Sequence, residues 1–433
     1  MTRIEIPASV TTISSWAFGY CTNLTSIEIP ASVTSIGEEA FAYCESLTSI
    51  TIPGSVTDID SWAFGYCTDL TSIIISDGVK RIGNNAFNGC TSLTSVTIPA
   101  NMTDIGVGAF AGCTSLESIE IPASVTSIYP AAFASCTRLA SVTIYAPELS
   151  EYGWHAFEKN ASGRKIYVFN KSLATYKAQA SEMAVNEDDI KAIAGISLKD
   201  AADNSALIAA ANGNSLNVTL QGRTLWKDGD WNTLCLPFST ELTGDLADAD
   251  IRALSSASLS GDGVLTLNFT AEGAVTSITA GVPYIVKWAG SEGQYVENPV
   301  FEGVTMSSTE AGSVTSTDGN VQFLGTYSPV TLEANDRSKL YLGAANKLYW
   351  PSKDKTIGSF RAYFELSDGV EAREFVLNFG DEEATGIVSI DNGQLTIDNW
   401  AAAAWYDMQG RKLDGKPTAK GLYIHNGKKV VIK

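Results

Sequence analysis

The sequence predicts a repeat solenoid at the N-terminal end, with one short strand and one helical turn in each 23-residue coil. An all-β sandwich and a small C-terminal β-domain should follow. Cysteines and Ala-Phe pairs each recur at intervals of 23 residues. Such a period indicates stacked repeats, because one unit cannot bury its apolar face alone. Beyond the repeats, short alternating apolar runs separated by Gly, Asp, Asn and Ser predict strands.

The residues of a single coil indicate where its strand and its helical turn should lie. Ile50 and Ile52 flank a polar residue, which is the pattern of a strand with one buried face. Pro53 has no backbone N–H, so the strand should end before it. Phe64 and Cys67 are three residues apart, as on one side of a helical turn. We expect five side chains of this region to be almost fully buried: Phe64, Cys67, Leu70, Ile73 and Ile75.

The period also places one cysteine at the same point of six coils: Cys21, Cys44, Cys67, Cys90, Cys113 and Cys136. A metal site, a disulfide ladder and a structural core column are the three explanations. Zinc needs four converging ligands, which a linear column does not supply. Adjacent coils lie within disulfide reach, but side chains on neighbouring rungs point the same way. We therefore expect a core column, with these six and Cys235 as unpaired thiols.

The repeat resembles a known family. The stretch LTSIEIPASVTSIGEEAFAYC, Leu24 to Cys44, and its copies are similar to the BspA-like leucine-rich repeat surface proteins of the Bacteroidota type. The closing stretch KIYVFNKSLATYKAQ resembles that family's last coil, in which a strand runs into a short helix. The resemblance implies a secreted or cell-surface, non-enzymatic recognition or adhesion protein. Host extracellular matrix or other surface proteins would be its partners.

Four segments follow from these patterns. Residues 1–182 should form the repeats with their C-terminal cap, 183–199 a linker, and 200–383 the sandwich-like domain, which should begin with a short helix around Ser205–Ala211. Residues 384–433 resemble the C-terminal sorting-type domain of Bacteroidota secreted proteins, on Tyr406-Asp407 and GLYI at 421–424. Because the first residues already fall within a repeat, we expect any signal peptide upstream and an extracellular or outer-surface location.

Composition disfavours several functions. The net charge of −19 argues against nucleic acid as a partner. No apolar run is long enough to be a transmembrane segment. His155 and His425 are the only histidines and fall in different predicted domains, so no catalytic set, cofactor motif or enzyme is expected. Asp58–Asp60 and Asp228–Asp230 could hold calcium, but acidic turns without a metal are the more common explanation.

Aromatic residues are the strongest candidates for a binding surface. Five of them lie beside the buried Phe and Cys positions and should point outward: Trp16, Tyr20, Tyr43, Trp62 and Tyr66. They could pack only on one another, or form a patch for a protein or glycan. The opposite strand face should carry the column from Glu28 to Thr143. A glycan is the alternative ligand, through four tryptophans of the central domain: Trp226, Trp231, Trp288 and Trp350.

Overall fold

The computed structural model describes residues 2–261, 263–290, 293–343, 346–367, 370, 372 and 374–379. Beyond these, it describes the backbone of short strands at 385–386, 390–391, 394–395, 405–406, 412–413, 421–425 and 428–432. The chain forms two compact units. The first comprises residues 1–196 and 205–216, and the second comprises 197–204 and 217–433.

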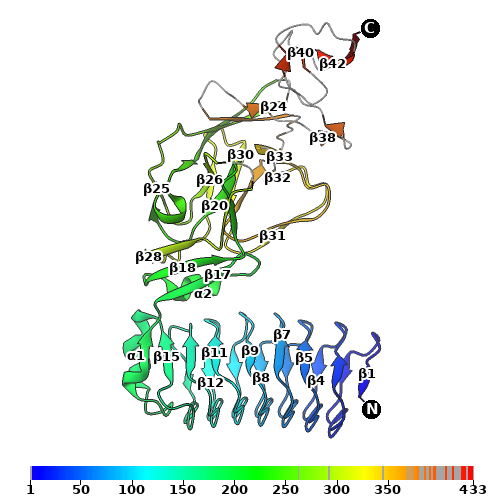
Figure 1. The fold of residues 1–433 in the computed structure, drawn as a ribbon, viewed down its shortest axis with the longest axis vertical. Coiled ribbons are helices and arrows are strands. Elements are labelled where there is room, and N and C mark those ends of the chain that lie inside the picture. Colours follow the sequence, from blue (N-terminus) through cyan, green and yellow to red (C-terminus); the bar gives the residue numbers. More distant parts are fainter. Residues whose placement is uncertain are drawn as a thin grey trace. The chain divides into compact units, whose positions relative to one another are not determined.

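The first unit is the solenoid that the repeat predicts (Figure 1). The longer strands of successive coils pair in parallel in three sheets, so that Ile50 lies opposite Ile73 and Ile52 opposite Ile75. The strand at Ser49–Ile52 ends before Pro53, as predicted. The first of these sheets contains β1 (Arg3–Glu5) and β3 (Ser26–Glu28), the second β5 (Ser49–Ile52), β7 (Ser72–Ile75) and β9 (Ser95–Thr97), and the third β11 (Ser118–Ile121), β13 (Ser141–Ile144), β15 (Lys165–Val168) and β16 (Ile190–Ala192).

A second sheet lies on the other side of each coil and is built from two-residue strands. Its seven strands also pair in parallel, each with the equivalent strand of the next coil. They are β2 (Thr12–Ile13), β4 (Ser35–Ile36), β6 (Asp58–Ile59), β8 (Arg81–Ile82), β10 (Asp104–Ile105), β12 (Ser127–Ile128) and β14 (Glu151–Tyr152). The isoleucine of each strand from β2 to β12 is buried, which closes the coil around one core.

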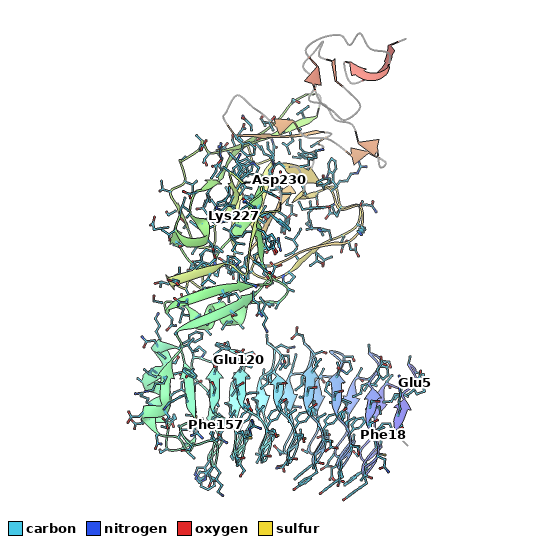
Figure 2. All side chains as sticks on the ribbon, viewed as in Figure 1. Glu5, Phe18, Glu120, Phe157, Lys227 and Asp230 are labelled. Carbon is cyan, nitrogen blue, oxygen red and sulfur yellow. The ribbon has the colours of Figure 1, made fainter. Side chains whose placement is uncertain are left out.

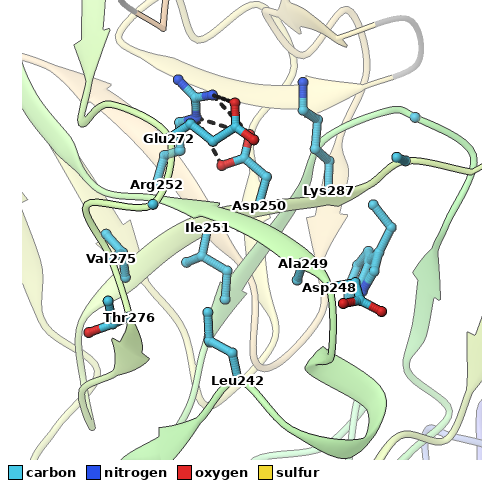
Figure 3. A pocket seen from close by; sticks show the side chains of 14 residues that line it. Leu242, Asp248, Ala249, Asp250, Ile251, Arg252, Glu272, Val275, Thr276 and Lys287 are labelled. Carbon is cyan, nitrogen blue, oxygen red and sulfur yellow. Dashed lines mark hydrogen bonds and ion pairs between the residues drawn. The ribbon is translucent and has the colours of Figure 1, made fainter.

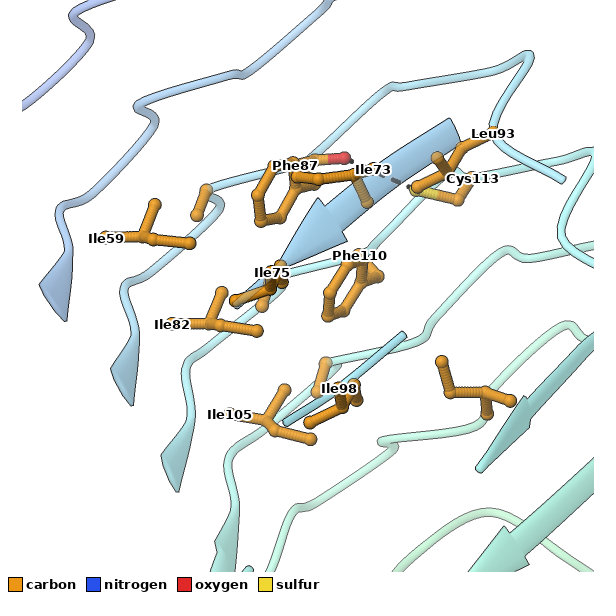
Figure 4. Close-up of a cluster of buried hydrophobic side chains, with 14 of the residues drawn as sticks. Ile59, Ile73, Ile75, Ile82, Phe87, Leu93, Ile98, Ile105, Phe110 and Cys113 are labelled. Carbon is orange, nitrogen blue, oxygen red and sulfur yellow. Dashed lines mark hydrogen bonds between the residues drawn. The ribbon is translucent and has the colours of Figure 1, made fainter. Parts of the chain in front are cut away.

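Columns of identical side chains fill that core (Figure 4). Seven phenylalanine rings, from Phe18 to Phe157, stack face to face with centroids 5.0–5.5 Å apart. These two residues mark the two ends of the column (Figure 2). Phe64, Cys67 and Leu70 are fully buried, and Ile73 and Ile75 are 3% and 2% exposed, as predicted. The side chains of one coil are therefore buried by its neighbours.

The cysteine side chains of the solenoid core donate hydrogen bonds to buried backbone carbonyls. All seven cysteines are free thiols, and only Cys21 is half-exposed. Each thiol from Cys44 to Cys136 donates a hydrogen bond of 3.1–3.3 Å to the phenylalanine carbonyl of the preceding coil. In the last coil the Asn160 amide donates to the Phe133 oxygen instead, at 2.8 Å. The column is thus a ladder of buried donors that satisfies buried carbonyls.

The C-terminal end of the solenoid is closed by regular structure. Strand β15 leads into a 3₁₀ turn at Asn170–Ser172 and helix α1 (Leu173–Ala178), as the closing sequence predicts. The buried Arg164 donates to the Phe157 carbonyl at 2.7 Å. Residues 183–199, expected as a linker, contain a 3₁₀ turn at Glu187–Asp189 and strand β16, which pairs with β15. Helix α2 (Ser205–Ala211) lies where a short helix was predicted.

The second unit is built from strands. A three-stranded sheet contains β17 (Gly195–Lys199), β18 (Ser215–Gln221) and β28 (Val300–Thr305), and another contains β20 (Asn232–Cys235), β26 (Pro283–Trp288) and β22 (Ala249–Arg252). Two-stranded pairs are β19 (Thr224–Trp226) with β27 (Tyr295–Glu297), β21 (Thr240–Glu241) with β25 (Ser277–Ile278), and β31 (Val330–Leu332) with β34 (Lys355–Ile357). A 3₁₀ turn spans Gly244–Leu246.

Two larger sheets of this unit share one apolar core. The first contains β23 (Leu254–Leu259), β24 (Val264–Phe269), β36 (Glu374–Asn378) and β37 (Thr385–Gly386). The second contains β29 (Ser313–Thr315), β30 (Val321–Gly325), β35 (Ala362–Leu366), β32 (Lys339–Gly343) and β33 (Lys347–Tyr349). Phe269 packs edge-on against Phe323 and Phe364, with centroids 6.5 Å away from each.

The predicted C-terminal domain, 384–433, lies for the most part outside the described residues. Within it the backbone forms β38 (Ile390–Asp391) paired with β39 (Gln394–Leu395). It also forms a sheet of β41 (Lys412–Leu413), β40 (Trp405–Tyr406), β42 (Gly421–His425) and β43 (Lys428–Ile432). The sorting-type function of this segment stays a prediction.

Candidate functional site

The candidate aromatic residues lie on a segment whose backbone differs from the prediction. The expected helical turn is a series of linked turns, because two residues of each coil, four positions apart, have positive φ. Trp62 and Tyr66 are two of them, with φ of 58° and 57°. The N–H groups of Trp62, Phe64 and Tyr66 bond to carbonyls of the next coil, at 2.7–2.9 Å, whereas the Gly65 N–H bonds within its own coil. We call the surface formed by these segments the turn face.

All five candidate residues occupy positive-φ positions of the turn face. Glycine adopts this conformation without steric cost, whereas other residues do so at a cost of about 1–3 kcal/mol each. Later coils place other residue types at the same points: Asn85, Gly89, Gly108, Gly112, Ala131, Ser135, His155 and Lys159. The solenoid therefore forms without aromatic residues there, and the fold alone does not explain why the first three coils carry them.

The five rings form one continuous surface, which we call the aromatic ladder. Tyr20, Tyr43 and Tyr66 stack with centroids 4.6 and 4.9 Å apart. Trp16 lies parallel to Tyr20 at 5.8 Å, and Trp62 lies parallel to Tyr66 at 5.9 Å. Trp16, Tyr20 and Tyr66 are 43%, 59% and 37% exposed. The structure thus contains the mutual packing that one explanation requires, and it still leaves edges and outer faces open to a partner.

Small residues shape both the ladder and its end. A Cβ at Gly65 would lie 2.7 Å from the Trp62 ring, and one at Gly19 would lie 2.6 Å from the Trp16 ring. Each indole therefore rests on a glycine of its own coil. A Cβ at Gly89 would lie 2.6 Å from the Tyr66 ring, so the tyrosine stack ends against a bare backbone.

One carboxylate belongs to the same surface. Glu39 occupies the position in the second coil that Trp16 and Trp62 occupy in the first and third, and its φ is 56°. Burial and, next, the neighbouring Glu38 raise the pKa of Glu39 above its usual value. Burial first, and then its neighbours including Glu39, raise the pKa of Tyr43. The sequence reasoning missed Glu39, although its 23-residue distance from each tryptophan was a readable signal.

The far end of the turn face carries a second aromatic group that was also missed. Trp154 is exposed and contacts the His155 ring at a tilt of 34°, with a centroid distance of 3.8 Å. The His155 Nδ1 lies 2.9 Å from a Glu158 carboxylate oxygen. On the opposite, strand face, the column from Glu28 to Thr143 includes the exposed Ile74. His425 lies on β42, where only the backbone is described.

The candidate calcium segments are engaged within the protein. Asp58 accepts hydrogen bonds from Arg81 and Thr57, and Asp60 accepts one from the Ser61 N–H. Asp228 accepts one from the Asp230 N–H. Across the part of the chain with described side chains, no three His, Cys, Asp or Glu residues are grouped as metal ligands would be.

The second unit contains a hollow of about 780 Å³ (Figure 3). Asp248, Asp250, Arg252, Glu272 and Lys287 contribute its charged side chains. The Arg252 guanidinium is buried, bonds to Asp250 at 2.9–3.1 Å, and lies over the Trp231 ring at 5.7 Å. Arg252 also lies 3.9 Å from a Glu272 carboxylate oxygen, so this arginine and its two carboxylates form a structural ion-pair group.

The tryptophans of the glycan alternative do not form one surface. Trp231 and Trp288 are buried, with 5% and 4% exposure, and Trp350 is half-buried. Only Trp226 is exposed, and it meets the exposed Tyr295 across the β19–β27 pair at 5.3 Å. The sequence did not reveal the burial, because indoles of core and binding surfaces look alike in one sequence.

No described helix has the length and apolarity that crossing a lipid bilayer requires. Comparison with curated proteins finds none that matches. Among solved structures, the Treponema pallidum leucine-rich repeat protein is 28% identical, with coverage of 33% of this chain and 72% of that chain and a TM-score of 0.32. A leucine-rich repeat protein from Eubacterium ventriosum is 29% identical, covering 37% and 44%, with a TM-score of 0.34.

A leucine-rich repeat protein from Bacteroides ovatus is 27% identical, covering 38% of this chain and 63% of that chain, with a TM-score of 0.24. The matched part thus spans less than two thirds of the Eubacterium and Bacteroides chains. The family described as the BspA type leucine rich repeat region matches in six copies, over residues 1–114 and 59–180. With the 23-residue coil and its Phe and Cys columns, this match places residues 1–180 in the BspA-type leucine-rich repeat family.

Proposed function

We propose that this chain is a secreted or cell-surface recognition protein without enzymatic activity. It binds another protein through the aromatic ladder on the turn face of its solenoid. The supporting observation is that five aromatic residues of the first three coils occupy positive-φ positions, where the next three coils carry only small or amide residues: Asn85, Gly89, Gly108, Gly112, Ala131 and Ser135. Aromatic rings with exposed edges supply large contact areas at low entropic cost, which is typical of protein interfaces.

The geometry of the rings favours a protein over a glycan as the partner of the ladder. Sugar rings bind by lying flat on aromatic faces, but the faces of Tyr43 are covered by Tyr20 and Tyr66. The stacked phenol rings, with centroids 4.6 and 4.9 Å apart, present their edges together with the exposed indole of Trp16. Such a row offers hydrogen bonds and apolar contact to an irregular protein surface.

The family gives the context for the partner. BspA-like relatives suggest host extracellular matrix proteins or proteins of other bacteria as ligands, and an extracellular or outer-surface location. The tail, 384–433, would then serve export or anchoring. The second unit would space the solenoid from the cell.

A panel of immobilised matrix proteins, including fibronectin, fibrinogen, laminin and collagen, tests this function with the full chain. We expect saturable binding to at least one of them. The triple variant Trp16→Asn, Tyr20→Asn, Trp62→Asn should bind about tenfold or more weakly, because interface aromatics carry most of the binding energy. Asn is chosen because Asn85 adopts the same backbone conformation in a later coil.

Ile74→Thr is the matched control, because it removes an exposed apolar side chain from the strand face. Its binding should equal that of the unmodified chain. If the triple variant binds every member of the panel as well as the unmodified chain does, the ladder is not the contact surface.

A glycan-binding function remains the second candidate, on the exposed pair Trp226 and Tyr295 alone. A glycan array probed with the full chain, and with Trp226→Ala, tests it. Loss of a specific signal in the variant would favour this function, whereas an array without a signal would exclude it for the glycans present.

A further inference from the structure

In the second coil of the aromatic ladder, a glutamate stands at the position that holds a tryptophan in the first and third coils. Along the solenoid, Trp16, Glu39 and Trp62 occupy the same position of three successive coils. Glu39 therefore lies between two indoles, one on each neighbouring coil. We propose that these three residues form a slot that binds the guanidinium group of an arginine on a partner protein. This inference rests on the proposed function and adds the chemistry of its partner.

The planes of the two indoles are close to parallel, because each is nearly parallel to a tyrosine of one stack. Trp16 is inclined by 5° to Tyr20, Trp62 by 15° to Tyr66, and the intervening tyrosines stack at 4.6 and 4.9 Å. The indole planes are thus two rungs apart, about 9–10 Å at the usual strand spacing. A planar cation midway between them lies about 5 Å from each ring, within the range of a cation–π contact.

The carboxylate supplies the second half of the site. Glu39 is half-buried, and its backbone N–H is bonded to the Ser61 carbonyl of the next coil at 3.0 Å, which holds the residue between the two indoles. The turns of the first three coils, at 14–21, 37–44 and 60–67, contain no Lys, Arg or His, and Glu38 and Asp60 are their other charged residues. A guanidinium would gain both a charge-assisted hydrogen bond and two aromatic faces.

The surrounding charge favours a basic partner. Residues 1–70 contain eight acidic residues and one basic residue, Arg3. An acidic surface attracts a basic segment of a partner and orients its approach. Arginine fits better than lysine, because its planar guanidinium stacks between parallel rings and is less strongly hydrated than an ammonium group.

Ligand-observed saturation-transfer NMR with the full chain tests the slot directly. The probes are N-acetyl-arginine N-methylamide and N-acetyl-lysine N-methylamide, each titrated at neutral pH and physiological salt. We expect the arginine probe to bind at least about threefold more tightly than the lysine probe. Glu39→Gln and Trp62→Asn should each weaken arginine binding about fivefold, the change that one charge or one cation–π contact typically makes.

Glu38→Gln is the matched control, because it changes net charge by the same amount one residue outside the slot. It should change arginine binding less than about twofold, as expected for an exposed charge. Equal binding of both probes, equal effects of the two Glu variants, or no binding of the arginine probe would each overturn the slot. If the triple variant of the aromatic ladder still failed to bind the matrix protein, the proposed function would stand without the slot. If the triple variant bound normally, the proposed function would be wrong as well.

Discussion

At the scale of single residues, the positive-φ positions show that the fold requires a left-handed backbone there but accepts aromatic side chains as well as glycine. The repeat predicts where Trp16 and Tyr20 lie, but aromatic residues give no local signal for positive φ. The signal was present in other coils, because Gly89, Gly108 and Gly112 occupy the equivalent positions. Exposure of the rings could thus be predicted from neighbouring core residues, whereas their backbone conformation required the comparison of coils.

Tyr66→Asn tests this distinction by stability. The variant loses stacking worth about 0.5–1.5 kcal/mol. It also gains a residue that adopts positive φ more readily, which offsets roughly 1 kcal/mol. The free energy of unfolding, measured by urea denaturation, should therefore change by less than about 1 kcal/mol. A loss above about 3 kcal/mol would assign the ladder a structural role in the solenoid.

The thiols give a second prediction at this scale. Burial raises the pKa of Cys44 and Cys90 to about 12 and that of Cys67 well above its usual value. Thiolate is the reactive form, so these groups should resist alkylation. Iodoacetamide and mass spectrometry should find about one modified cysteine, the half-exposed Cys21, in the native chain, and seven after denaturation without reductant. Two or more disulfides in the unreduced protein would contradict the free-thiol column.

At the scale of the coil, the sequence predicted the strand, its end and its core, because periodic burial is written into residue spacing. The prediction of a helical turn in each coil was wrong. Phe64 and Cys67 point inward as a helix would place them, but every second N–H bonds to the next coil. Spacing of three residues reports which side chains share a face and does not report the hydrogen bonds that hold them there.

Phe64→Ala tests the core of one coil. Its ring stacks on Phe41 at 5.0 Å and on Phe87 at 5.3 Å. Removing it leaves a cavity between two coils and should cost about 3–5 kcal/mol in the free energy of unfolding. Val107→Ala, at an exposed position of the same unit, is the control and should cost under about 0.5 kcal/mol. A cost below about 1 kcal/mol for Phe64→Ala would count against the stacked column.

The thiol ladder also predicts a dependence on pH. Because the folded-state pKa values of Cys44 and Cys90 lie near 12, above those of the unfolded chain, the native state retains protons that the unfolded state loses. Stability is therefore complete below about pH 8.5 and falls as pH rises toward 12, by about 1.4 kcal/mol per pH unit for each thiol.

Thermal unfolding at pH 7, 9.5 and 11 measures this trend, and Cys90→Ala should reduce its slope by the contribution of one thiol. An identical slope in the variant would mean that other groups, such as the buried Tyr176, dominate the alkaline transition.

At the scale of the whole molecule, the repeats could be predicted far better than the rest. Six copies of one pattern fix the register, as between Ile50 and Ile73. The second unit lacks a period, so its sequence predicted strands but not their pairing, such as the parallel contact of β24 with β36. For the same reason, the burial of Trp231 was not predictable, because it depends on Arg252 and Phe379, which are distant in sequence.

Hydroxyl-radical footprinting of the full chain, with and without the matrix protein that it binds, tests recognition through the aromatic ladder most directly. Our account predicts that Trp16, Tyr20 and Tyr66 lose reactivity in the complex. The exposed Ile74 on the strand face and Trp154 at the far end of the turn face should stay reactive. Protection of Ile74 with an unprotected ladder would contradict the account and assign recognition to the strand face.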